Sequence, residues 1–270
     1  MRRTAMLSLR EGGMKWGALL AALLSLLFTA HALAATGREP PPPGSFPGAP
    51  PQYTRFTSAE LIRGFLALAF GSDLRIGAKP RGIRRFDRPI RAHVVPGGSV
   101  DRSAMMHRVL EEYARKVPNL HLSLGGASNS DLEVRLIDEK NFDSALTAAF
   151  GPKVAKTFIA RTDPQCMTSV KSNSRGEIVH AVSFIIVDKG NDVFLDCAYH
   201  ELLHAFGLSN HDQHNPWTTL NQNRTVGYLS VYDRALLTLL YDPRMRPGMT
   251  RGQARRILPT VIRSLGLAAR

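Results

Sequence analysis

The sequence predicts one α+β domain, and three features of its apolar patterning indicate this fold class. Strand-like segments, with apolar residues at every second position, occur at residues 90–94, 120–124, 132–136 and 177–187. Helix-like segments, with apolar residues three and four positions apart, occur at residues 57–71, 101–117 and 250–265. An apolar run at residues 193–206 follows the last of these strands. Because the two kinds of segment are interspersed, we expect a single α+β or three-layer domain over residues 53–270.

Capping residues mark where the predicted helices begin and end. Thr57 and Glu60 form a capping box, and Gly71 ends the helix that they open. Pro118 ends the helix at residues 101–117. A later helix begins at Ser230–Asp233 and ends before Pro243, and the last segment contains Pro259, which predicts a kink. Residues 142–150 are predicted as a short helix or a loop.

The apolar run contains the motif His-Glu-x-x-His, formed by His200, Glu201 and His204. A helix that is apolar nearly all round is a buried one, and residues four apart lie on the same face of it. Two imidazoles and a carboxylate in such a helix cost several kcal/mol unless they are partnered. A zinc ion would satisfy the histidines, and Glu201 would then activate water. The alternative is a core helix whose histidines bond to the backbone, although the motif arises by chance in roughly one such chain in a hundred.

The first 34 residues have the organisation of an export signal. Four basic residues precede the apolar run 18–28, and Ala32-Leu33-Ala34 fits a signal-peptidase cleavage site. The apolar run is too short to span a bilayer comfortably, although an uncleaved anchor is the alternative. We therefore expect a secreted or periplasmic protein with no transmembrane segment after cleavage. Residues 35–52 are rich in proline and are predicted to be a linker.

The chain is basic, with a formal net charge of +13 that falls to +10 when residues 1–34 are removed. A positive charge of this size predicts attraction to an anionic cell-envelope surface, or it only keeps the protein soluble. We find no nucleic-acid-binding motif and expect no nucleic-acid partner. The arginines of the last helix are predicted either to lie on a solvated face or to contact an anionic surface.

Cys166 and Cys197 are the only cysteines, and an even pair in an exported protein predicts a disulfide. Closing a loop of this length would stabilise the fold by about 3–4 kcal/mol in the chain-entropy model. The bond would also restrain the histidine helix, because Cys197 lies one turn before His200. A free buried thiol or a zinc ligand is the alternative.

With Gly207, the three motif residues match the first part of the extended pattern HExxHxxGxxH, or the same pattern with a final Asp, and on this basis the chain resembles the metzincin clan of zinc endopeptidases. The resemblance covers residues 84–241, and residues 228–241 resemble the closing helix of matrix-metalloprotease-like domains. It implies a mixed β-sheet packed against a long helix and a buried HExxH active-site helix, followed by C-terminal helices. Residues 240–249 also resemble a bacterial exported family of unknown function.

Two departures from the clan pattern concern the metal site. The third ligand is expected at position 210, which is Asn210, whereas His211 lies one residue later and His214 lies beyond it. All three remain candidates, with His211 preferred because imidazole is a far better zinc ligand than an amide. The clan also has a methionine turn, but residues 212–227 contain no methionine. Trp217 or Leu220 is therefore expected beneath the metal.

These features predict a zinc-dependent endopeptidase in which His200, His204 and His211 bind zinc and Glu201 acts as the general base on a peptide or protein substrate. One alternative is a non-catalytic envelope protein that binds an anionic surface and keeps a structural zinc or none. Another is a zinc hydrolase acting on the peptides of peptidoglycan.

Overall fold

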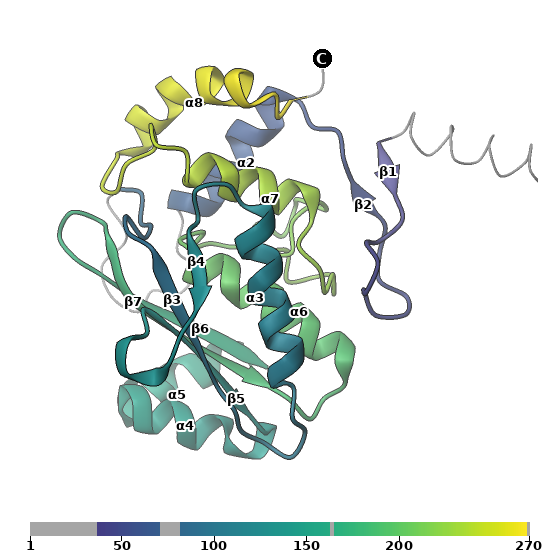
Figure 1. The fold of residues 1–270 in the computed structure, drawn as a ribbon, viewed down its shortest axis with the longest axis vertical. Helices are drawn as coiled ribbons and strands as arrows, with labels where there is room; N and C mark the ends of the chain where they lie inside the picture. The colour runs from purple at the N-terminus through teal and green to yellow at the C-terminus, as the bar shows by residue number, and fades with distance from the viewer. Residues whose placement is uncertain (1–36, 71–81, 163–164, 269–270) are drawn as a thin grey trace, which may run out of the picture.

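A computed structural model describes residues 37–70, 82–162 and 165–268 of the chain (Figure 1). The predicted export signal lies outside these residues. Within them, no helix is both long and apolar enough to cross a bilayer. The strands are β1 (Arg38–Glu39), β2 (Gln52–Tyr53), β3 (Ile90–Val95), β4 (Leu122–Leu124), β5 (Leu132–Ile137), β6 (Cys166–Ser172) and β7 (Ile178–Ile186). The α-helices are α2 (Ser58–Phe70), α3 (Ser103–Lys116), α4 (Phe142–Phe150), α5 (Pro152–Thr162), α6 (Asn191–Ala205), α7 (Val231–Leu240) and α8 (Arg251–Leu265).

A five-stranded mixed sheet with the order β4-β3-β5-β7-β6 forms the frame of the domain. The pairs β3–β4, β3–β5 and β5–β7 are parallel, and only the edge strand β6 is antiparallel to its neighbour. The predicted strand at residues 120–124 begins only at Leu122, because Asn119 and His121 have positive φ angles and turn the chain. The mixed sheet and its helices confirm the predicted class in its coarse form.

Helices α3 and α6 cover one face of the sheet. They bury the large apolar residues of β5, namely Leu132, Val134 and Leu136, within the main core. The Tyr113 hydroxyl of α3 donates a hydrogen bond of 2.8 Å to the backbone carbonyl of Tyr199 in α6. This bond joins the two helices at the residue immediately before His200, so α3 helps to fix the histidine helix.

The opposite face of the sheet is covered by α4 and α5, at the lower left of Figure 1. A second, smaller core forms there from Phe142, Leu146, Ala155 and Phe158 packed against Met167 of β6 and Phe184 and Ile186 of β7. Side chains alternate between the two faces of a strand, so successive residues of β6 contact two different layers. Helix α5 and strand β6 were not predicted from the sequence.

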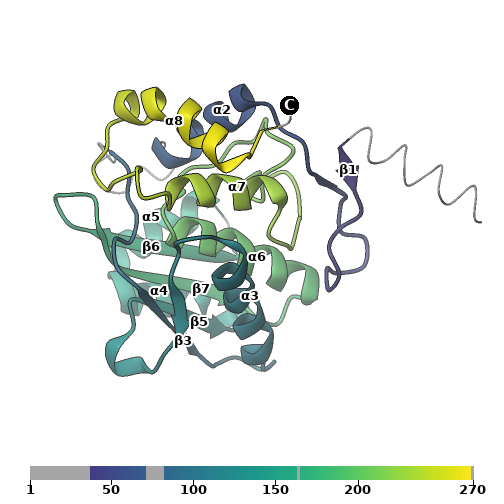
Figure 2. The ribbon, with the colours of Figure 1, turned by 45° about the horizontal axis from the view of Figure 1, so that its top comes forward.

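Helices α2, α7 and α8 form a group at one end of the molecule, as Figure 2 shows. Gly64 of α2 lies so close to Tyr232 of α7 that a Cβ atom at position 64 would lie 1.8 Å from the tyrosine hydroxyl. Pro259 lies inside α8 without ending it. The short loop after α7 is held by Arg85, whose guanidinium donates to the carbonyls of Leu240 and Met245.

Residues 37–53, most of which were predicted as a linker, contact the domain at several points. Strands β1 and β2 pair with each other, at the right of Figure 1. The rings of Tyr53 and Trp217 are in tilted contact, with centroids 6.0 Å apart, and the hydroxyl of Tyr228 donates a 2.8 Å hydrogen bond to the carbonyl of Pro50. Aromatic contacts of this kind were not predicted, because a run of prolines carries no information about tertiary partners.

Candidate metal centre

Helix α6 carries the His-Glu-x-x-His motif and is buried on most of its surface, as the sequence predicts. Its buried residues include Phe194, Leu195, Ala198, Leu202 and Leu203. His200 and His204 lie on one side of this helix, one turn apart, and both are half-buried. The helix therefore presents two imidazole rings at a partly accessible edge of an apolar core.

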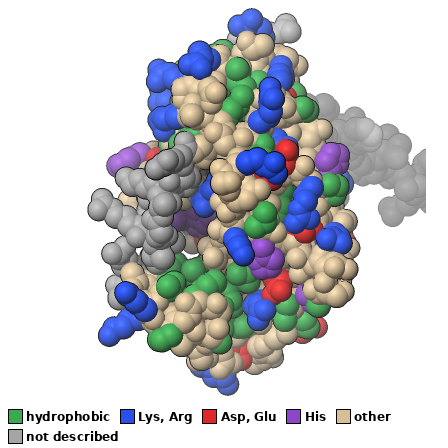
Figure 3. Space-filling view, turned by 90° about the vertical axis from the view of Figure 1, so that its left-hand side faces the viewer, with side chains coloured by type: hydrophobic (Ala, Val, Ile, Leu, Met, Phe, Trp, Pro, Cys, Tyr) green, Lys and Arg blue, Asp and Glu red, His purple; other side chains and the backbone are tan. Residues whose placement is uncertain are grey.

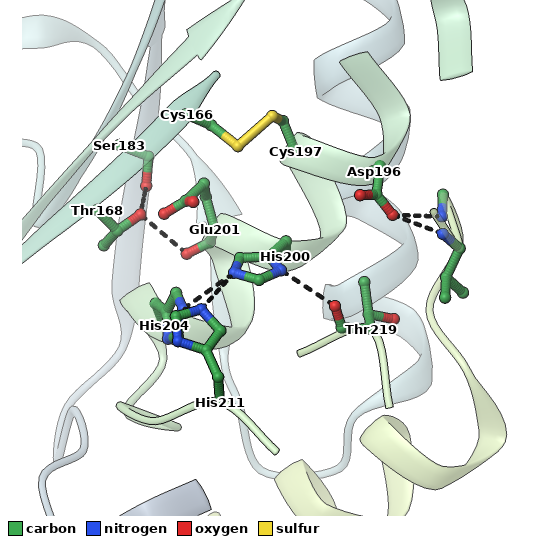
Figure 4. Close-up of a disulfide and its surroundings, with 12 residues drawn as sticks. Cys166, Thr168, Ser183, Asp196, Cys197, His200, Glu201, His204, His211 and Thr219 are labelled. Carbon is green, nitrogen blue, oxygen red and sulfur yellow. Dashed lines mark hydrogen bonds between the residues drawn. A yellow bond between two sulfur atoms is a disulfide. The ribbon is translucent and has the colours of Figure 1, made fainter. Parts of the chain in front are cut away.

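Three imidazole rings meet at one point, as Figure 4 shows. The Nε2 atom of His200 lies 2.9 Å from that of His211 and 3.1 Å from that of His204, and the third distance, between His204 and His211, is also 3.1 Å. These are the ligand atoms of a possible metal site. A triangle of this size admits a point about 2.0–2.1 Å from all three nitrogens, which is the zinc–nitrogen distance.

Backbone carbonyl groups orient two of these rings. The Nδ1 atom of His200 lies 3.0 Å from the carbonyl oxygen of Thr219, and that of His204 lies 2.6 Å from the carbonyl oxygen of Leu208. Because a carbonyl oxygen can only accept, both Nδ1 atoms must carry the proton. In the neutral rings, each Nε2 atom therefore directs a lone pair at the point where the three rings meet.

Burial keeps these two rings neutral. Desolvation, followed by the effect of His211, lowers the pKa of His200 to about 3. Desolvation likewise lowers the pKa of His204 well below its ordinary value, and His200 and His211 add to the shift. Both rings are consequently in the form that binds metal ions at neutral pH.

The loop after α6 explains why the third histidine lies at position 211. Gly207 has φ +113°, and a Cβ atom there would lie 2.1 Å from the carbonyl oxygen of Arg84. The backbone N–H groups of Ser209 and Asn210 both donate to the carbonyl of Leu68 at the end of α2. These contacts hold Ser209 and Asn210 against α2, and the next residue, His211, reaches the other two histidines.

Neither of the other two candidates for the third position joins the cluster. The Asn210 side chain donates a 3.1 Å hydrogen bond to the carbonyl of Ala67 in α2. His214 is exposed, and its backbone N–H donates to Asp212. The structure thus brings together the preferred set, His200, His204 and His211.

Glu201 lies on the side of α6 that faces β6, beside Thr168 in Figure 4. The residue is only 4% exposed, and its Oε2 atom has no hydrogen-bond partner within the described parts of the chain. Burial, with a smaller effect of Asp196, raises the pKa of this carboxyl group to about 8, although the Thr168 hydroxyl opposes the shift. A buried carboxyl group with one unpartnered oxygen and a strongly raised pKa is a candidate for a functional role.

Strand β6 and helix α6 are connected at two points near the histidines. The Thr168 hydroxyl lies 2.7 Å from that of Ser183 and donates a 3.1 Å bond to the backbone carbonyl of Glu201. The predicted disulfide between Cys166 and Cys197 is confirmed. Because both cysteines are in this bond, they are not metal ligands.

The turn below His200 is formed by Thr218 and Thr219 and is held by Asp233, the third residue of α7. The Asp233 carboxylate accepts hydrogen bonds from the Thr218 hydroxyl (2.5 Å), the Thr219 N–H (2.8 Å) and the Ser230 hydroxyl (2.8 Å). Its side chain is fully buried. Trp217, one of the two residues expected beneath the metal, packs instead against Phe56 and Tyr232.

A second carboxylate, Asp196, joins α6 to the end of the same loop. It lies one turn before His200 and accepts hydrogen bonds from the N–H groups of Val226 (2.6 Å) and Gly227 (3.2 Å). Burial raises the pKa of Asp196 to about 6, and these two bonds oppose the shift. The loop at residues 212–229 is thus held by α7 in its middle, at Thr218 and Thr219, and by α6 near its end, at Val226 and Gly227.

Four residues around the site, Thr168, Asp196, Thr219 and Asp233, were not predicted from the sequence. Ser230 and Asp233 were recognised only as the start of a helix, which they also are, because the Ser230 hydroxyl accepts from the Asp233 N–H. The other three carry no sequence signal, since a threonine carbonyl or an isolated Asp has no characteristic spacing.

Comparison with known proteins identifies the family but not its activity. No curated protein and no solved structure matches the chain. One family model, described as "Protein of unknown function (DUF2927)", matches residues 58–260. This range contains the histidine cluster, Glu201 and the turn that Asp233 holds. The chain therefore belongs to the DUF2927 family of proteins of unknown function.

Proposed function

We propose that this protein is a zinc-dependent endopeptidase with a metzincin-like catalytic domain. The convergence of the three imidazoles is the observation that carries the proposal. His200 and His204 carry their ring protons on Nδ1. Of the three rings, only His211 could therefore carry a proton on Nε2 and donate it to another Nε2 atom. The lone pairs of His200 and His204 otherwise face each other at 3.1 Å, and a bound cation would remove that repulsion.

Zinc is the cation that this set of donors fits best. Imidazole nitrogen is a preferred zinc ligand, and three protein ligands leave one position open, as in catalytic rather than structural zinc sites. The three rings are half-buried rather than sealed in the core, so a substrate carbonyl and water could approach. A structural site would be expected to have a fourth ligand, and the described residues place no further His, Cys, Asp or Glu in this cluster.

In the proposed reaction, bound zinc supplies a Lewis acid that polarises the scissile carbonyl and makes water more acidic. Glu201 accepts the proton of the attacking water and passes it to the leaving amine. The carbonyls of Thr219 and Leu208 hold the two helix histidines in the required tautomer. Without a cation the Glu201 carboxyl has a pKa of about 8, and a nearby positive charge would lower it towards the range of a base at neutral pH.

Glu201→Gln tests the catalytic part of the proposal. The zinc-loaded chain and its variant would be assayed on a library of unstructured peptides and on cross-linked peptidoglycan peptides. We expect hydrolysis by the wild type and a loss of about a thousandfold or more in the variant, with zinc still bound at about one ion per chain. Glu111→Gln, an exposed glutamate of α3, is the matched control and should keep wild-type activity.

The outcomes of this experiment separate the proposed functions. Full activity in the Glu201→Gln variant would show that the general-base assignment is wrong. Tight zinc binding without hydrolysis by the wild type would instead favour a non-catalytic envelope protein on the same fold. Hydrolysis of peptidoglycan peptides alone would restrict the substrate class. The secreted or periplasmic location stays a prediction, since it depends on residues 1–34.

A further inference from the structure

The positive charge of the chain is concentrated at its C-terminal end. Residues 243–270 contain seven arginines, no lysine and no acidic residue. Residues 37–242, by contrast, contain 24 basic and 21 acidic residues. A uniformly basic protein would serve solubility equally well, so the location of the charge needs a separate explanation.

Helix α8 does not need its arginines in order to fold. Its apolar side, formed by Ala254, Leu258, Val261 and Ile262, is buried against the rest of the domain. Thr250 and Gln253 form a complete capping box at its start, and Gly266 ends it in the left-handed conformation. Neighbouring arginines repel one another, so an unpaired arginine face contributes nothing favourable to the stability of the isolated domain.

The outer side of α8 carries exposed arginines together with smaller exposed residues such as Thr260 and Ser264. Arg255, Arg256 and Arg263 are exposed, and none of them forms an ion pair with another described residue. Arg63 of α2, the helix against which α8 packs, is also exposed. In Figure 3, blue side chains gather at the upper end of the molecule, with little red among them. We call these four arginines the arginine face.

We propose that the arginine face docks the protein on an anionic phospholipid bilayer. Guanidinium groups bind phosphate oxygens through paired hydrogen bonds, which lysine cannot do. Helix α8 is about 22 Å long, so it can contact several lipid headgroups at once, whereas a free phosphate ion would meet only one or two arginines. Residues 243–270 contain no aromatic residue that could stack on a nucleic-acid base, and this favours a lipid surface.

The arginine face and the histidine cluster are formed by different residues. Helices α8 and α2 lie at the top of Figure 1, and the loop that carries His211 contacts the end of α2 through the backbone N–H groups of Ser209 and Asn210. The histidine cluster belongs to α6 and its following loop, and neither α8 nor Arg63 contributes to it. The docking proposal therefore stands or falls separately from the proposed peptidase activity.

Vesicle co-sedimentation tests the proposal directly. The chain without residues 1–34 would be mixed with vesicles of phosphatidylcholine, alone or with about 30% phosphatidylglycerol. We expect binding to the anionic vesicles only, and its loss in about 1 M salt, where the screening length falls to about 3 Å. Arg255→Gln, Arg256→Gln and Arg263→Gln together should weaken the binding by on the order of 100-fold, because each arginine near the surface contributes about fivefold.

A second triple variant controls for net charge. Arg108→Gln, Arg115→Gln and Arg175→Gln remove three exposed arginines from other parts of the molecule and should change vesicle binding only slightly. Equal losses in the two triple variants would overturn the proposal, and so would absence of binding by the wild type. Tighter binding to duplex DNA at the same phosphate concentration would show that the face serves nucleic acid instead. Competition by millimolar inorganic phosphate would point to a small-anion site. Equal thermal midpoints of all three proteins verify that they are folded.

Discussion

Two imidazole rings with their lone pairs facing each other are an unusual feature for a protein core. Protein interiors normally partner every buried polar atom, because an unpartnered one costs about 1–3 kcal/mol. Around α6 this rule fails several times. The His200 and His204 lone pairs converge, and Glu201 Oε2 and Asn210 Oδ1 have no partner among the described residues. Unpartnered buried polar atoms of this kind concentrate at functional sites, where a bound ligand provides the missing partner.

Asp233 is expected to act as a positioning residue for the metal centre through the Thr219 peptide. Its carboxylate accepts from the Thr219 N–H, and the Thr219 carbonyl accepts from His200 Nδ1. The amide of Asp233→Asn has one acceptor oxygen where the carboxylate has two, so the Thr218 hydroxyl, the Thr219 N–H and the Ser230 hydroxyl can no longer all donate to it as they do in the wild type. We predict that zinc affinity, measured by chelator competition, falls about 10–100-fold, as is typical for outer partners of a metal ligand.

Asp242→Asn is the matched control for this variant. Asp242 is also buried, lies just beyond the other end of α7, and binds Arg244 instead of the metal-site turn. Its substitution should lower the thermal midpoint while leaving zinc affinity within about threefold of the wild type. If Asp242→Asn weakened zinc binding as much as Asp233→Asn does, the effect would be one of general stability.

Asp196 is expected to make stability depend on pH. Burial raises its pKa in the folded protein from 3.8 to about 6. The folded state therefore holds this proton more tightly than the unfolded state does, and the resulting stabilisation is present below about pH 4 and is lost as the pH rises to about 6. The loss is on the order of 3 kcal/mol at most, since one pKa unit corresponds to about 1.4 kcal/mol.

Urea unfolding of the wild type and of Asp196→Asn at several pH values would measure this contribution. The free energy of unfolding of the wild type should fall relative to that of the variant between about pH 4 and 6. Carboxylates that do not interact with Asp196 titrate equally in both proteins and cancel in the difference, and Glu201, whose pKa Asp196 raises, titrates above this pH range. Parallel curves for the two proteins over this range would contradict the assignment.

At the scale of secondary structure, the sequence was most informative where one face of an element is buried. Helices α2, α3, α7 and α8 and strands β3, β5 and β7 follow apolar spacing that can be read directly. Strand β6 has the sequence Cys-Met-Thr-Ser-Val-Lys-Ser, in which Thr168 interrupts the side that faces α6, between Cys166 and Val170, and Ser169 and Lys171 follow Met167 on the other side. Because Thr168 bonds to α6 instead of packing as an apolar side chain, the apolar alternation that identifies a strand is missing.

At the candidate site, too, the sequence predicts only the residues whose spacing or number carries a signal. His200, Glu201 and His204 were predicted because a helix fixes their spacing, and Cys166 and Cys197 because they are the only pair. The choice among Asn210, His211 and His214 could not be made from the sequence. It depends on the hydrogen bonds of Ser209 and Asn210 to the end of α2, which is about 140 residues earlier in the chain.

Gly64 offers a test of the packing between α2 and α7. In an exposed helix, replacing glycine by alanine stabilises by about 1 kcal/mol. Here the new Cβ atom would lie 1.8 Å from the Tyr232 hydroxyl, which itself donates to the carbonyl of Glu60. We predict that Gly64→Ala lowers the free energy of unfolding by about 1–3 kcal/mol, because overpacking displaces the tyrosine. An increase in the thermal midpoint would show that the two helices separate at little cost.

For the molecule as a whole, the disulfide joins the sheet to the histidine helix. The bond connects Cys166 at the start of β6 with Cys197 in α6 across a sequence separation of 31 residues. Replacing both cysteines by serine should lower the free energy of unfolding by about 3–4 kcal/mol in the chain-entropy model. Comparison of urea midpoints with and without a reducing agent measures this effect, and only the wild type should respond to the reductant. A wild type that is insensitive to complete reduction would contradict the expected contribution.

X-ray absorption at the zinc edge of the zinc-loaded protein tests the proposed metal centre most directly. Three imidazole nitrogens at about 2.0–2.1 Å are expected, with a light-atom ligand at the open position. In His211→Ala one imidazole should be lost, while the glutamine variant at Glu201 should leave the spectrum unchanged. A zinc ion with fewer than three imidazoles in the wild type, or no zinc retained after dialysis, would contradict the assignment of His200, His204 and His211 as its ligands.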